Sequence, residues 1–127
     1  MVASFSYFRV HFYGRRPVYH TIQQITLLAT YIKLYGIFAI HKIIFEFAPS
    51  SYYSHGYHNI VLYNTGNHSF MVQFYHYYNS RNQLHVLHED CQKHDYHTLI
   101  HFLYHNPALN TLLVPYIHPA FTNDLNE

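Results

Sequence analysis

The stretch PVYHTIQQITLLATYIKLYGIFAIHKIIFEF, residues 17–47, changes its hydrophobic period once along its length. Before Gly36, aliphatic residues recur at spacings of three and four, as on a helix with one buried face; they are Ile22, Ile25, Leu28 and Ile32. Pro17 suits the first turn of such a helix and Gly36 its end. After Gly36, apolar residues share one parity, as in a strand; they are Ile37, Ala39, Ile43, Phe45 and Phe47. We therefore predict a helix over 17–36 and a strand over 37–47.

Residues 22–47 also have an alternative interpretation, as a membrane-associated segment. A helix needs about 20 predominantly apolar residues to cross the hydrocarbon core of a bilayer. Here Lys33 interrupts the apolar run, and His41 and Lys42 close it. The pattern therefore favours the helix and strand of a globular domain, with membrane association through residues 22–47 kept as the alternative.

Shorter patterns on both sides of this stretch complete the predicted fold. Residues 4–13 alternate as a strand does, and three further β-rich runs are separated by the turn sequences Asn-Thr-Gly-Asn and Asn-Ser-Arg-Asn. A helical spacing ends before Asn106-Pro107. The later elements are expected as strands over 57–63, 68–78 and 84–88, a helix over 94–105 and a strand over 111–117. We predict an α+β fold, an antiparallel sheet flanked by two helices in the order β-α-β-β-β-β-α-β, as a single domain over residues 1–127.

The composition is poor in permanent charge and rich in histidine. Lys, Arg, Asp and Glu make up 10% of the 127 residues, where an ordinary domain carries about 25%. The 14 histidines outnumber them. Because an unperturbed imidazole titrates near pH ~6.5, the net charge of +1 rises steeply in mild acid. We therefore expect a pH-responsive surface, and better solubility at about pH 5.5 than at about pH 7.5.

The replacement of Lys and Glu by Tyr, His and Asn has a second explanation at the level of codons. These three residue types share codons that end in adenine and a pyrimidine, so a frame read across or opposite another gene would be rich in them. No Walker sequence or dinucleotide fingerprint occurs among the four glycines. The hypothesis is a small non-enzymatic protein from a young, overlapping or dubious reading frame, whose endogenous peptides mass spectrometry would detect or fail to detect.

A series of metal-ligating side chains runs through the C-terminal third. Imidazole and thiolate are natural ligands of zinc, nickel and copper, and histidines four apart on a helix share one face. The candidate metal ligands are His88, Cys91, His94, His97, His101 and His105, with zinc as the candidate cofactor. The alternative is that these histidines are the polar surface of an amphipathic helix. A metal- or pH-responsive binding module is thus the second functional hypothesis.

Basic and aromatic residues interleave near the N-terminus, a pattern typical of nucleic-acid binding. The residues are Tyr7, Arg9, His11, Tyr13, Arg15 and Arg16. Only five Lys or Arg precede the first acid, Glu46, and so few cations can neutralise few phosphates of a nucleic acid. A protein partner or self-association is therefore expected in preference to nucleic acid.

Three fragments resemble a Src-homology phosphotyrosine-binding domain. Residues 12–15 are similar to its opening aromatic and glycine, 36–40 to its central strand and 98–102 to its second helix. The resemblance implies an adaptor that binds phosphotyrosine. His41, however, stands where that family's phosphate-binding arginine follows the strand, and an imidazole lacks the bidentate fork of a guanidinium.

Overall fold

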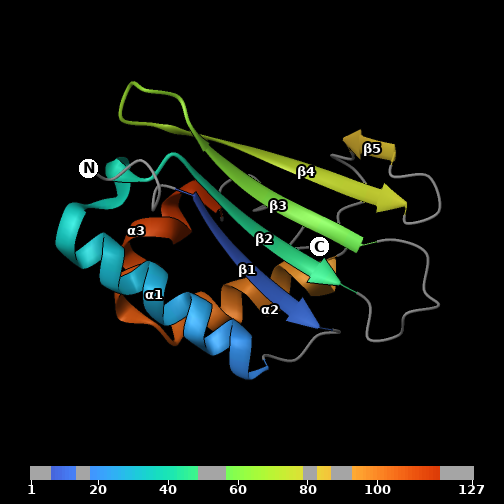
Figure 1. Cartoon of the computed structure of the whole chain (residues 1–127), viewed down its shortest axis with the longest axis horizontal. Coiled ribbons are helices and arrows are strands. Elements are labelled where there is room, and N and C mark those ends of the chain that lie inside the picture. The colour runs from blue at the N-terminus through green and yellow to red at the C-terminus, as the bar shows by residue number, and fades with distance from the viewer. Residues whose placement is uncertain (1–6, 14–17, 49–56, 79–82, 87–92, 118–127) are drawn as a thin grey trace.

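Five strands form one mixed sheet in the computed structural model of the chain, which describes residues 7–13, 18–48, 57–78, 83–86 and 93–117 (Figure 1). The strand order is β1-β2-β3-β4-β5. In chain order the elements are β1 (Tyr7–Tyr13), α1 (Tyr19–Tyr35), the 3-10 turn η2 (Ile37–Ala39), β2 (Lys42–Ala48), β3 (Tyr57–Asn64), β4 (Phe70–Tyr78), β5 (Gln83–Val86), α2 (Lys93–Tyr104) and α3 (Pro107–Ile117). The predicted α+β class is confirmed, and so is the predicted order of strands and helices through α2.

The sheet is mixed because β1 and β2 are parallel, which corrects the prediction of an antiparallel sheet. β1 pairs with β2 in the register Tyr7↔Lys42 to Tyr13↔Ala48, whereas β2, β3, β4 and β5 pair antiparallel. The 17 residues of α1 rise about 25 Å, close to the roughly 23 Å length of the seven-residue β1. The helix therefore returns the chain to the start of β1, and β2 leaves in the same direction.

The strand predicted over 37–47 begins only at Lys42. Gly36 ends α1 with φ +86°, in the left-handed region that favours glycine, and Ile37–Ala39 then form a 3-10 turn. Ile37 and Ile40 are both buried. Their spacing of three places them on one side of a 3-10 turn. The shared parity of Ile37 and Ala39 is therefore not part of a strand.

The final strand predicted over 111–117 is wrong, because these residues belong to α3. Leu109, Leu113 and Ile117 are fully buried at spacings of four, the period of a helix face. Pro107 occupies the first helical position, where its missing N–H is not needed. Pro115 lies inside the helix on its exposed side. The chain therefore has three described helices where two were expected.

All three helices pack on the same face of the sheet (Figure 1). Ring contacts tie each helix to a core-facing aromatic residue: Tyr31 of α1 to Phe8 at 5.0 Å, Phe102 of α2 to Phe12 at 5.6 Å, and Tyr116 of α3 to Phe70 at 5.1 Å between centroids. The buried strand residues on this face are Val10, Phe12, Ile43, Phe45, Phe47, Ile60 and Leu62. The described helices therefore leave the opposite face of the sheet without a helical cover.

Candidate functional site

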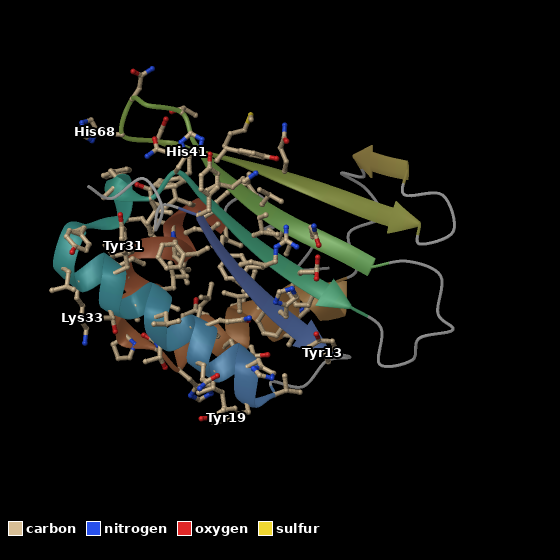
Figure 2. All side chains as sticks on the ribbon, in the orientation of Figure 1. Tyr13, Tyr19, Tyr31, Lys33, His41 and His68 are labelled. Atoms are coloured by element: carbon tan, nitrogen blue, oxygen red, sulfur yellow. The ribbon has the colours of Figure 1, made fainter. Side chains whose placement is uncertain are left out.

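The sheet face opposite the helices is here named the open face. It carries the strand residues that alternate with the residues buried under the helices. Its described side chains are Tyr7, Arg9, His11 and Tyr13 on β1, Lys42, Ile44 and Glu46 on β2, Asn59, Val61 and Tyr63 on β3, and Met71 and Gln73 on β4. Figure 2 shows Tyr13 at one end of β1 and His41 beside the far end of the sheet. The open face therefore runs the full length of β1.

One row of the open face crosses four strands in register. Tyr7 pairs with Lys42, Lys42 with Tyr63, and Tyr63 with Met71, and we name these four residues the aromatic row. The Lys42 ammonium lies 5.4 Å from the Tyr7 ring centroid and 5.5 Å from the Tyr63 centroid, within cation–π range of both. Tyr7 is 57% exposed and Met71 46%. The ring of Tyr7 and the thioether of Met71 are therefore exposed to solvent, whereas Lys42 and Tyr63 between them are half-buried.

A second part of the open face is a charge cluster around Glu46. Its carboxylate is largely buried and lies 3.1 Å from Nε2 of His11 and 3.7 Å from Nη1 of Arg9. The Arg9 side chain is half exposed. One carboxylate thus faces two basic side chains of the neighbouring strand.

Gln24 of α1 fixes the tautomer of His11. The His11 backbone N–H donates to Gln24 Oε1 at 2.8 Å, so the amide must turn its Nε2 toward the ring, where it lies 3.2 Å from Nδ1. Because the amide nitrogen can only donate, Nδ1 accepts and the proton of the neutral ring sits on Nε2, facing Glu46. Thr21 completes this junction, donating its hydroxyl proton to the His11 carbonyl. The edge of β1 is thereby tied to α1.

This arrangement occupies both nitrogens of the His11 ring. A general base needs a lone pair within reach of a substrate proton, and here Nδ1 already accepts from Gln24. The chemistry best served by the Arg9–His11–Glu46 cluster is therefore the placement of charge on a binding surface. Beside it, Asn59 is buried and its Oδ1 has no hydrogen-bond partner among the described residues.

The predicted metal ligands are only partly brought together. His97, His101 and His105 are exposed on or just after α2, and the rings of His101 and His105 are 4.5 Å apart between centroids. His94 lies in the first turn of α2, with its side chain outside the described part, and His88 and Cys91 fall outside the described residues. Within the part of the chain that the structure describes, no group of three or more His, Cys, Asp or Glu side chains could hold a metal ion.

Residues 36–40, which resemble the central strand of a phosphotyrosine-binding domain, include the 3-10 turn η2, so that part of the resemblance is wrong. His41 is exposed at the bend before β2, and its ring is 5.1 Å from that of Tyr7. Among the described helices, none combines the length and the apolar character that a membrane crossing requires.

Patterns within single segments do not predict that the β2, β3 and β4 residues of the open face form one site. The parity of residues 42–48 separates Lys42, Ile44 and Glu46 from the buried set, which is the signal that identifies them as one face. Their partners on other strands depend on register, which a single segment does not contain.

No family model, curated protein or solved structure matches this chain.

Proposed function

We propose that the chain is a non-enzymatic binding domain that docks a protein partner on the aromatic row of its open face. The observation that carries the proposal is the continuity of this row, from Tyr7 through Lys42 and Tyr63 to Met71, across four paired strands that no described helix covers on this face. Tyr, Met and Arg are the residue types enriched in the cores of protein interfaces. The row supplies two tyrosines and a methionine, and Arg9 lies one position beyond it on the same face.

The charge of the open face favours a protein over a nucleic acid. Among its described residues Arg9 and Lys42 contribute +2 and Glu46 −1, so the sum is +1 while His11 is neutral. Arg9 and His11 face Glu46, and Lys42 faces two rings. Affinity for nucleic acid grows with the number of phosphates that free cations neutralise. A near-neutral face with exposed rings therefore fits a protein surface better.

Site-specific photocrosslinking in the native cells tests the proposal. A photoreactive phenylalanine is placed at Tyr7, and the matched control carries it at Tyr19, which is 71% exposed but lies on α1 and points away from the sheet (Figure 2). We expect one discrete protein adduct from position 7 and none from position 19. Equal adducts at both positions, or adducts that nuclease removes, would contradict a protein interface on the open face.

The hypothesis of an overlapping or dubious reading frame makes a different prediction. An unselected frame has no partner, so position 7 gives no discrete adduct, and endogenous tryptic peptides are not detected. Detection of those peptides together with the position 7 adduct rules it out. The proposed function and the reading-frame hypothesis are therefore separated by the same experiment.

A further inference from the structure

Two imidazole rings lie close together at the C-terminal end of α2. His101 and His105 are one helical turn apart and both exposed, and their ring centroids are 4.5 Å apart at an interplanar angle of 72°. The chain continues the turn beyond Tyr104, because the His105 N–H donates to the Phe102 carbonyl at 3.2 Å. Both rings are therefore held near each other by backbone geometry.

The helix beneath the two rings is anchored in the core. Leu99 and Leu103 of α2 are fully buried, and Phe102 contacts Phe12 of β1. The opposite side of the helix must then face solvent, where His101 and His105 lie. Because packing fixes the orientation of α2, two ligands meet there with little ordering of the backbone required.

We propose that His101 and His105 together chelate one zinc-class divalent cation. Imidazole nitrogen is a preferred ligand of zinc, nickel and copper, with Zn–N bonds of about 2.0–2.1 Å. The two nitrogens of a tetrahedral zinc site lie ~3.3 Å apart, a separation that rings already in contact reach by side-chain rotation. Water completes the coordination, because no third described side chain joins the pair. This site shares no residue with the aromatic row, so the proposal is independent of the proposed function.

A zinc titration of the full chain, followed by the imidazole NMR signals of His101 and His105, tests the proposal. If one ion bridges the two rings, both signals shift along one saturation curve with a single Kd. In H105Q the zinc Kd reported by the His101 signal should rise by at least about tenfold, because His101 then binds the ion alone. Magnesium at the same concentration should shift neither ring, since it prefers oxygen ligands.

The control variants are H97Q, which removes the histidine one turn before His101, and H20Q, which removes an exposed histidine of α1. In both variants the zinc Kd reported by the His101 signal should stay within about twofold of the wild-type value. Far-UV circular dichroism checks that each variant keeps its helices. The wild-type titration alone can overturn the proposal: if the two rings follow different saturation curves, one ion does not bridge them. A loss in H97Q as large as that in H105Q would also overturn it.

Discussion

His11 on β1 lies directly opposite Glu46 on β2, and its Nε2 is 3.1 Å from Oε1 of that carboxylate. The parallel register of the two strands creates this pair, and Gln24 of α1 orients the imidazole from its other side. A contact between two strands is thereby linked to the packing of a helix at the edge of the sheet. The consequences for stability can be measured residue by residue.

Replacing the carboxylate in Glu46→Gln should lower the free energy of unfolding by about 1–2 kcal/mol, because charge-assisted contacts to a largely buried group are lost. The matched variant Arg9→Gln removes a side chain that is 53% exposed, so its effect should stay below about 1 kcal/mol. Urea unfolding at neutral pH measures both. A larger loss from Arg9→Gln than from Glu46→Gln would show that the cluster is held mainly by the exposed pair.

Gln24→Met keeps the length of the side chain and removes both of its hydrogen bonds to His11. We expect a loss of about 1 kcal/mol and faster amide exchange at His11, whose N–H loses its acceptor. Gln23→Met, at the exposed neighbouring position of α1, is the control and should change neither quantity. If His11 exchanges at the same rate in both variants, Gln24 does not protect the strand edge.

Asn64 links the end of β3 to the segment before β2. Its Nδ2 donates to the carbonyls of Phe38 and Ile40, each at 2.9 Å, and its Oδ1 accepts from the Gly66 N–H at 2.8 Å. Asn64→Asp removes both donated bonds and turns a negative charge toward two carbonyl oxygens, so we expect a loss of about 2 kcal/mol in thermal or urea unfolding. Asn67→Asp, exposed in the adjacent turn, should cost less than about 0.5 kcal/mol. Equal losses of stability in the two variants would show that the hydrogen bonds of Asn64 do not contribute to the stability of the fold.

The buried phenol of Tyr31 predicts a loss of stability in alkali. Burial raises its pKa above the ordinary value, and the neighbouring Tyr35 raises it further. The unfolded chain releases this proton near pH ~10 while the folded chain still holds it. The contribution of Tyr31 is therefore complete below about pH 10 and is lost as the pH rises through the folded pKa.

Tyr31→Phe removes this titration, so its stability should fall less steeply above about pH 10 than that of the wild type. At neutral pH the change should be small, because among the described residues the Tyr31 hydroxyl has one long contact, 3.5 Å to the Ala39 carbonyl. Tyr19→Phe, at an exposed position, is the control and should keep the wild-type slope. Parallel alkaline curves for Tyr31→Phe and the wild type would contradict the assignment.

The fold was predictable wherever one period dominated a segment. The change of period at Gly36 predicted α1 and most of β2, and Asn106-Pro107 correctly marked the end of α2. Residues 111–117 of α3 were predicted as a strand, although Leu109, Leu113 and Ile117 have a helical spacing. The helix forms there because the burial of this face outweighs the interruption by Pro115.

The open face was predictable only in part. Tyr7, Arg9, His11 and Tyr13 share one parity within a single strand, and the sequence shows that directly. The neighbours that complete the site come from the parallel pairing of β1 with β2, which depends on the path of α1 and not on any local pattern. For that reason neither the Glu46–His11 pair nor the position of Lys42 between Tyr7 and Tyr63 followed from the sequence.

Docking on the open face is tested most directly by lysine acetylation footprinting, in native cells and on the purified protein. Lys42 lies in the aromatic row, whereas Lys33 is exposed on α1 and points away from the sheet (Figure 2). We predict that the labelling rate of Lys42 relative to Lys33 falls by at least about threefold in cells, because a bound partner covers only the open face. The same ratio in cells and in the purified protein would contradict the proposal.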